Sequence, residues 1–288
     1  MRFTERVAIR LKTQAPSSFI LRTVYRMGMR LKNILNVSAG LVWLLPEFYR
    51  VYANNRRGNR TYKVRNLVDE LKKVASWHSI FLGLIDFWEL SPEFNEFFGR
   101  ASKAPSGVNI TRGFMLYQFL KQIDNLDGNV AEVGVYKGRS AKLIALTVEK
   151  QNKHVYLFDT FAGLPEVNPE KDNYHQKGDF NETSLAEVQE FLADCKNITI
   201  YPGFFPDTAE PIRDKKFCFA HIDVDIYRSV LDCCQFFYPR LASGGMMVFD
   251  DPGFVICAGA KIAIDEFFTN KEEFPIHLAT GQVLVIKH

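Results

Sequence analysis

After Gly128 the sequence alternates short runs of β-branched and aromatic residues with helical segments, and this alternation limits the possible folds more than any other feature. A strand, a helix and a further strand in succession build a parallel sheet with right-handed crossovers, which helices cover on both faces. The expected strands are 130–135, 154–159, 198–201, 217–223 and 246–250, and the expected helices are 139–150, 184–193, 227–240 and 258–269.

The last two expected strands, 276–279 and 282–287, break this alternation. Only Thr280 and Gly281 separate them, so they should form a hairpin in which one strand runs antiparallel to the rest. The sequence therefore predicts an α/β fold: a doubly wound, mostly parallel, seven-stranded Rossmann-like sheet with a terminal antiparallel hairpin strand.

The first 125 residues differ from this region in pattern and charge. Residues 1–75 hold 16 Lys and Arg against 4 Asp and Glu, which leaves 20 and 29 of the totals of 36 and 33 for the rest. We expect residues 1–60 to be a basic arm, suited to a membrane surface, a partner subunit or its own domain. Residues 61–125 should form a helical lead-in, because apolar positions recur at helical spacing there. The main domain should then cover residues 126–288.

The apolar and cysteine content indicates a cytoplasmic location. The longest apolar run near the N-terminus, residues 39–46, is far shorter than the roughly 20 residues that span a bilayer. The five cysteines are odd in number and lack zinc-site spacing, so we assign them no chemistry and expect a reducing compartment. The arm could hold the protein at the inner face of the membrane or mediate self-association, so we expect a homo-oligomer and no nucleic-acid partner.

The first strand-to-helix turn has features of a cofactor site. Gly134 lets the backbone approach a ligand, Gly138 lets the next helix start close to the strand, and Ser140 can cap that helix. The dinucleotide pattern GxGxxG is absent. Glu132 would repel a pyrophosphate but attract the ammonium group of an amino-acid moiety. A plain tight turn is the alternative.

Two later strand ends extend this site. Asp159 ends the second strand, where a carboxylate can accept hydrogen bonds from both ribose hydroxyls of a nucleoside, and Thr160 follows it in the same turn. Phe204, just after the third strand, could flank an adenine ring. Asp207, nearby, could instead cap the next helix.

Aspartates gather at the ends of the fourth and fifth strands. Asp223 and Asp225 follow one strand, and Asp250 and Asp251 end the other. Carboxyl ends of parallel strands meet at one crevice, where unpaired carboxylates would repel one another and a hard divalent cation would resolve the repulsion. The alternative is that one of these aspartates caps a helix and another forms an ion pair with Arg228 or Lys261. His221 shares the face of Asp223 and is expected to be a buried core histidine.

These segments together resemble the macrocin O-methyltransferase family, which has the class I methyltransferase fold. The resemblance runs from about residue 128 to residue 268. It rests on Glu132–Val135 with Gly138 and Ser140, Phe158–Pro165, Gly203–Phe205 with Asp207 and Thr208, Ile222–Tyr227, and Asp250–Asp251. It implies S-adenosylmethionine as the methyl donor, Mg²⁺ or Mn²⁺ held by Asp223, Asp250 and Asp251, and a hydroxyl of a sugar or glycoside as the acceptor.

In such a reaction the cation activates the acceptor hydroxyl, and Asp223 or Asp225 takes its proton as general base. We favour Asp223 as a ligand that doubles as base and place Asp225 beside it. Pro252 and the basic segment 1–60 depart from the family pattern, which leaves the acceptor open. The alternatives are a nicotinamide-dependent oxidoreductase on a similar sheet and an inactive scaffold or adaptor of the same fold.

Overall fold

A computed structural model describes residues 87–105 and 107–288 of the chain. Residues 88–288 form one compact unit. The expected basic arm, 1–60, and the first part of the expected helical lead-in, residues 61–86, lie outside the described residues. None of the helices within the described ranges is long and apolar enough to cross a membrane.

The described residues contain a seven-stranded sheet with the order β3-β2-β1-β4-β5-β7-β6. The first five strands pair in parallel, whereas β7 runs antiparallel to β5 and to β6. The predicted fold class is therefore confirmed, including the final hairpin. The strands are β1 (Asn129–Val133), β2 (Val155–Asp159), β3 (Ile198–Pro202), β4 (Phe217–Ile222), β5 (Leu241–Phe249), β6 (Ile276–His277) and β7 (Val283–Ile286).

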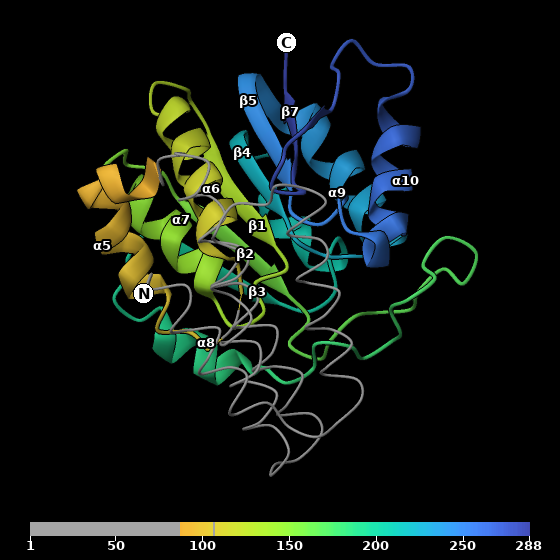
Figure 1. Ribbon diagram of the computed structural model, residues 1–288, viewed down its shortest axis with the longest axis horizontal. Helices are drawn as coiled ribbons and strands as arrows, with labels where there is room; N and C mark the ends of the chain where they lie inside the picture. Colours follow the sequence, from red (N-terminus) through yellow and green to blue (C-terminus); the bar gives the residue numbers. More distant parts are fainter. Residues whose placement is uncertain (1–86, 106) are drawn as a thin grey trace, which may run out of the picture. The chain divides into compact units, whose positions relative to one another are not determined.

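Helices cover both faces of this sheet (Figure 1). One face carries α5, α6 and α7, and the other carries α9 and α10, so the apolar side chains form two cores separated by the strands. The helices are α5 (Pro92–Ala101), α6 (Ile110–Gln122), α7 (Arg139–Glu149), α8 (Leu185–Phe191), α9 (Tyr227–Phe237) and α10 (Ala258–Phe268); 3-10 turns span Phe87–Leu90, Asp207–Ile212, Tyr238–Arg240 and Val255–Cys257.

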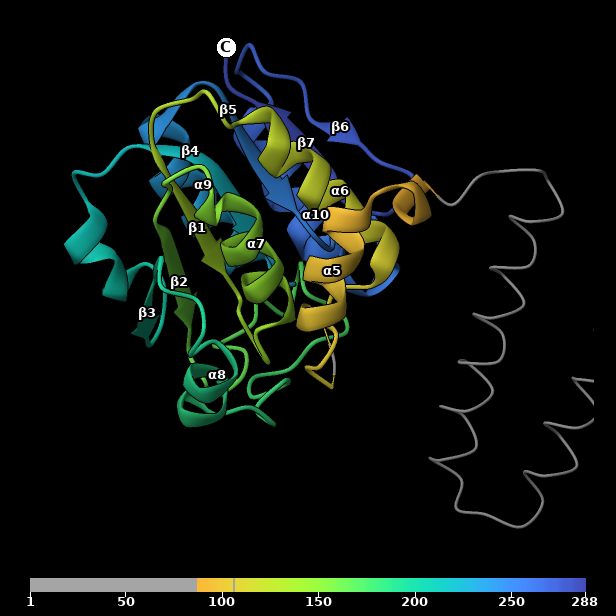
Figure 2. The same cartoon turned by 90° about the vertical axis from the view of Figure 1, so that its left-hand side faces the viewer.

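The two helices before β1 are locally specified by their caps. The Ser91 hydroxyl accepts a hydrogen bond from the backbone N–H of Phe94, and Pro92 occupies the first turn of α5. The Asn109 side chain accepts from the N–H of Arg112 at 2.9 Å and starts α6. Both helices pack against α7, as the turned view also shows (Figure 2). This packing places Arg112 beside the ends of the central strands.

Candidate active site

A cavity of about 280 Å³ opens where the five parallel strands end. Its wall includes residues that end or follow these strands, namely Gly134, Asp159, Gly203, Asp223, Asp250 and Asp251. Thr160 and Phe204, both predicted to bind a cofactor, also line it, as does Asp225. The structure thus brings the glycine turn, the Asp159 turn and the aspartates to one cavity.

Gly134 directly follows β1 and lies against the backbone of Asp223, which directly follows β4. Its φ of +92° favours glycine, and a Cβ added there would lie 1.7 Å from the backbone oxygen of Asp223. The N–H of Asp223 in turn donates to the carbonyl oxygen of Val133 at 2.9 Å. Glycine is therefore required at position 134 because the backbones that follow β1 and β4 are in close contact there.

Asp159 holds the first strand-to-helix turn in place. Its Oδ2 accepts hydrogen bonds from the backbone N–H groups of Val135 and Tyr136 at 2.8 and 2.7 Å, and its Oδ1 accepts from Phe161 at 2.7 Å. A carboxylate offers about four acceptor sites, so three are in use in this arrangement. The residue shapes the pocket, with one acceptor site left for a further donor.

Glu132 and His221 form a buried pair between β1 and β4. Both are fully buried, and His221 Nδ1 lies 2.8 Å from Glu132 Oε1. Burial lowers the pKa of His221, but the carboxylate of Asp250, 3.6 Å from Nε2, and the hydrogen bond with Glu132 outweigh it and raise this pKa to about 10. The interpretation of His221 as a buried histidine is confirmed. Glu132 does not line the cavity; it contacts His221, whose Nε2 lies 3.6 Å from Asp250 Oδ1.

Helix α7, which follows the turn after β1, does not start as the sequence predicted. Gly138, with φ of +82°, is the N-cap of α7, and no side chain caps that helix. The prediction that Ser140 caps it is wrong, because Ser140 is the second helical residue and is buried. The Thr160 hydroxyl donates to the carbonyl oxygen of Gly163 at 2.7 Å and so stabilises its own turn.

The aspartates converge as two overlapping groups. Carboxylate oxygens of Asp223, Asp225 and Asp251 lie within 4.8 Å of one another. Asp223 and Asp250 form a second group with His221 at the same spacing. Asp225 has a φ of +57°, a backbone conformation that costs energy in a residue other than glycine and that is concentrated at functional sites.

Arg112 of α6 reaches into this group and was missed by the sequence analysis. Its Nη1 donates to Asp250 Oδ2 and lies 3.5 Å from Asp251 Oδ1. Gln282 Nε2 donates to the other oxygen of Asp250 at 2.8 Å. Although burial raises the pKa of Asp250, the contact with His221 and the charge of Arg112 hold it below its usual value. Asp250 is therefore a well-compensated carboxylate.

Asp223, Asp225 and Asp251 are not compensated in this way. Burial first, and then repulsion among the neighbouring carboxylates, raises the pKa of Asp223 and Asp251 well above the ordinary value. The same causes raise the pKa of Asp225 to about 7. Asp251 Oδ2 is buried and has no hydrogen-bond partner among the residues described. An all-oxygen set with an unsatisfied buried acceptor fits a hard divalent cation such as Mg²⁺.

The raised pKa of Asp225 predicts that the stabilisation of the fold by Mg²⁺ depends on pH. Unfolded Asp225 ionises near pH 3.8, whereas the folded chain keeps the proton up to about pH 7. The folded state thus binds more protons, so stability falls as the pH rises between these values, by up to on the order of 4 kcal/mol. Mg²⁺ should raise the unfolding temperature more at about pH 8 than at about pH 5. Thermal unfolding at matched ionic strength checks this; an equal gain at both pH values would contradict it.

Comparison with known proteins finds relatives with a common activity. The model of the family described as macrocin-O-methyltransferase (TylF) matches residues 116–278. Demethyldecarbamoylnovobiocin O-methyltransferase of Streptomyces niveus is 26% identical over 159 residues, covering 50% of this chain and 59% of the relative. Mycinamicin III 3''-O-methyltransferase of Micromonospora griseorubida is 29% identical over 146 residues, covering 44% and 56%. The match spans less than two thirds of these relatives.

Solved structures show the same fold. The O-methyltransferase NovP superimposes with a TM-score of 0.59 at 20% identity and covers 69% of this chain and 98% of its own. A calicheamicin methyltransferase gives a TM-score of 0.55 at 20% identity, with 68% and 93% covered. At this level of identity the likeness concerns the fold alone.

Proposed function

The chain belongs to the macrocin-O-methyltransferase family, and on that premise we propose that it transfers a methyl group from S-adenosylmethionine to a hydroxyl of a sugar or glycoside, with a divalent cation. The observation that carries the proposal is the single cavity to which all five parallel strands contribute residues. Its glycine-and-aspartate end suits a nucleoside, and its acidic end suits a cation and a hydroxyl group.

The cofactor end of the cavity is proposed to hold the nucleoside and the methionine moiety. Asp159 would accept a hydrogen bond from a ribose hydroxyl, and Phe204 would flank the adenine. Gly134 and Thr160 shape the wall beside them. Gly138, Ser140 and Glu132 would support this end from behind, since Ser140 and Glu132 are buried and none of the three lines the cavity.

Asp159→Asn tests the cofactor end. The amide keeps the size but loses one acceptor oxygen and the charge, so we expect adenosylhomocysteine to bind about 10- to 100-fold more weakly, corresponding to about 1.5–3 kcal/mol. Calorimetric titration measures this change, and thermal unfolding separates it from a loss of folded protein. Asp207→Asn is the matched control, because Asp207 is an exposed aspartate that follows β3. Unchanged affinity in Asp159→Asn would refute the ribose role.

The acidic end is proposed to hold the cation between Asp223 and Asp251, with Asp250 on its flank. When bound, the cation supplies positive charge that lowers the pKa of an acceptor hydroxyl and fixes its direction. Arg112 neutralises Asp250 and, through its contact with Asp251, part of the remaining charge. Four carboxylates can therefore share one site, because the Arg112 guanidinium already compensates the charge of Asp250.

A carboxylate of this group is proposed to accept the hydroxyl proton. The acceptor oxygen forms its bond to the methyl carbon as the carbon–sulfur bond of the sulfonium breaks, and the proton passes to Asp223 or Asp225. A pKa of about 7 for Asp225 matches a base that works near neutral pH. Asp223 lies within the same carboxylate group and serves as ligand and base in our proposal.

The proposal is tested by methyl transfer. Purified protein is incubated with methyl-labelled S-adenosylmethionine, Mg²⁺ and separate pools of nucleotide sugars and glycosides, and the label is followed into the acceptors. We expect transfer to at least one sugar hydroxyl. Tight binding of adenosylhomocysteine without transfer to any pool would favour the scaffold alternative. Reduction of a nicotinamide cofactor by the same pools would favour the oxidoreductase alternative.

The domain division is also proposed. Residues 126–288 would be the methyltransferase domain, 61–125 its helical lead-in and 1–60 a basic arm that binds an anionic membrane or a partner subunit. Deleting 1–60 should leave affinity for adenosylhomocysteine within about twofold while abolishing salt-sensitive sedimentation with anionic vesicles or changing the oligomeric state. Sedimentation and light scattering measure both effects. A deletion variant that no longer folds would show that these residues belong to the core.

A further inference from the structure

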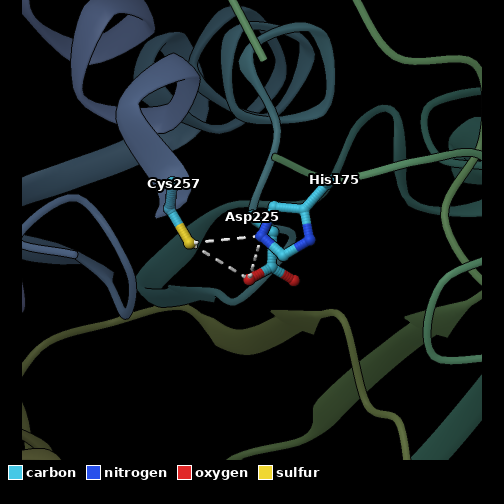
Figure 3. Close-up of side chains that lie close together, drawn as sticks. All are labelled: His175, Asp225 and Cys257. Atoms are coloured by element: carbon cyan, nitrogen blue, oxygen red, sulfur yellow. Dashed lines mark hydrogen bonds and ion pairs between the residues drawn. The ribbon is translucent and has the colours of Figure 1, made fainter. Parts of the chain in front are cut away.

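Three side chains with different donor atoms meet beside the carboxylate group (Figure 3). His175 comes from the loop between β2 and α8, Asp225 follows β4, and Cys257 lies at the start of α10. The cysteine spacing predicted no chemistry for Cys257, yet the loop brings His175 Nε2 to 3.5 Å from its sulfur.

The spacing of the three donors matches a tetrahedral metal site. Cys257 Sγ lies 3.5 Å from His175 Nε2 and 3.4 Å from Asp225 Oδ1, and the last two atoms are 3.8 Å apart. Zinc bonds of about 2.3 Å to sulfur and about 2.0–2.1 Å to nitrogen and oxygen, at tetrahedral angles, would place such donors about 3.3–3.6 Å apart. A small movement of His175 toward Asp225 would complete the fit.

The surroundings of the trio suit a metal ligand set. The side chain of His175 is only 3% exposed, and Cys257 is 2% exposed. His175 Nδ1 has no hydrogen-bond partner among the described residues but lies 3.5 Å from Asp179 Oδ2. A metal-bound histidine commonly directs its second ring nitrogen toward a carboxylate, which fixes the ring.

The loop that carries His175 is fixed on both sides of it. Asp172 Oδ1 accepts a hydrogen bond from the N–H of Tyr227 at 2.8 Å, which ties the loop to the start of α9. On the other side, the carbonyl oxygen of Asp179 accepts from the N–H of Leu164 at 2.8 Å. The donors are therefore held in position before any metal binds, which reduces the entropy lost on binding.

We propose that His175, Asp225 and Cys257 form a binding site for a zinc-class transition metal. It adjoins the proposed Mg²⁺ ligands Asp223, Asp250 and Asp251, and Asp225 links it to that carboxylate group. A thiolate and an imidazole favour Zn²⁺ over Mg²⁺, and three protein ligands leave a fourth position for water or another ligand. Binding replaces the thiol hydrogen bond to Asp225 and releases the Cys257 proton to solvent. This inference goes beyond the proposed methyl transfer and does not depend on it.

Metal titration in excess Mg²⁺ tests the site. Full-length, metal-free protein is saturated with Mg²⁺ and titrated with Zn²⁺ by calorimetry. We expect one equivalent to bind, and Cys257→Ser or His175→Asn to weaken it by about 100-fold or more. With Co²⁺ in place of Zn²⁺, the wild type should show a thiolate-to-cobalt charge-transfer band that Cys257→Ser lacks.

Cys195→Ser is the matched control, because Cys195 is also buried but belongs to none of the metal-ligand clusters found among the described residues. It should keep both the zinc equivalent and the cobalt band. The proposal is overturned if no zinc binds in excess Mg²⁺, which would leave a hydrogen-bonded trio. It is also overturned if Cys257→Ser binds as tightly as the wild type, or if Asp251→Asn removes the zinc equivalent while Cys257→Ser retains it. The cobalt spectrum of the wild type decides the case even if a variant fails to fold.

Discussion

Asp251→Asn is expected to slow methyl transfer about 100-fold or more, equivalent to on the order of 3 kcal/mol of transition-state stabilisation. Asp251 belongs to the all-oxygen group, and one of its oxygens is buried without a partner among the described residues. Removing its charge therefore weakens the proposed cation site while keeping the shape of the side chain. High Mg²⁺ should restore part of the rate, because the remaining ligands still bind weakly.

The neighbouring aspartates should respond differently from one another. Asp250→Asn should also slow transfer, but it further leaves Arg112 without its strongest partner. Recovery by Mg²⁺ should be poorest for Asp223→Asn, since Asp223 is proposed to take the proton as well. Asp265→Asn, at an exposed i,i+4 ion pair on α10, is the matched control and should keep full activity.

Chelation tests the same mechanism without mutation. Protein treated with excess chelator should bind adenosylhomocysteine with unchanged affinity, lose turnover, and regain it with Mg²⁺ or Mn²⁺. The rate measured with labelled S-adenosylmethionine is the readout. Full turnover in excess chelator would eliminate the cation from the mechanism and leave Asp223 as a metal-free base.

Gly134→Ala should abolish binding of adenosylhomocysteine and destabilise the fold by about 3 kcal/mol or more. The added Cβ would lie 1.7 Å from the carbonyl oxygen of Asp223. Neither strand end can move freely, because the N–H of Asp223 donates to Val133 and the N–H of Gly134 donates to Phe158. Relief of the clash must therefore separate β1 from β4 at the cavity. Calorimetric binding and chemical unfolding measure the two losses.

Gly99→Ala is a control that should change the stability of the fold in the opposite direction. Gly99 is exposed within α5, and no atom lies within 4 Å of where its Cβ would be. Alanine is favoured over glycine in a helix, so this change should stabilise the protein by up to about 1 kcal/mol. If Gly134→Ala were as harmless as Gly99→Ala, the close approach of the two strand ends would not be essential.

The sheet could be predicted from the sequence because its signals are local. Each strand is a short apolar run, and the Thr280-Gly281 turn marks the hairpin by itself. The convergence of Asp223 with Asp250 and Asp251 followed from topology, because strand ends of a parallel sheet share one edge. Expected strand and helix boundaries mostly fell within a few residues of those observed; the largest difference is β5, which starts at Leu241 rather than near Met246.

The contacts that the sequence did not reveal all join distant parts of the chain. Arg112 reaches Asp250 from a helix 138 positions earlier, and His175 meets Cys257 across 82 positions. Such pairs depend on how the helices and a long loop pack, and the spacing of apolar residues in the sequence does not predict this packing. The pairing of Glu132 with His221 depends on the register of β1 against β4. In this protein the sequence predicted which acidic residues gather at the strand ends, but it did not predict the residues that compensate their charge.

The position of β7 also affects how the molecule is assembled during synthesis. This strand lies between β5 and β6, and Gln282 beside it contributes a hydrogen bond to Asp250. The N–H of Gly253 donates to the carbonyl oxygen of Gly281. A nascent chain that has emerged only as far as α10 would therefore have an open edge at β5 and an incompletely satisfied Asp250. Until residues 281–286 leave the ribosome, that edge is exposed to pairing with other chains.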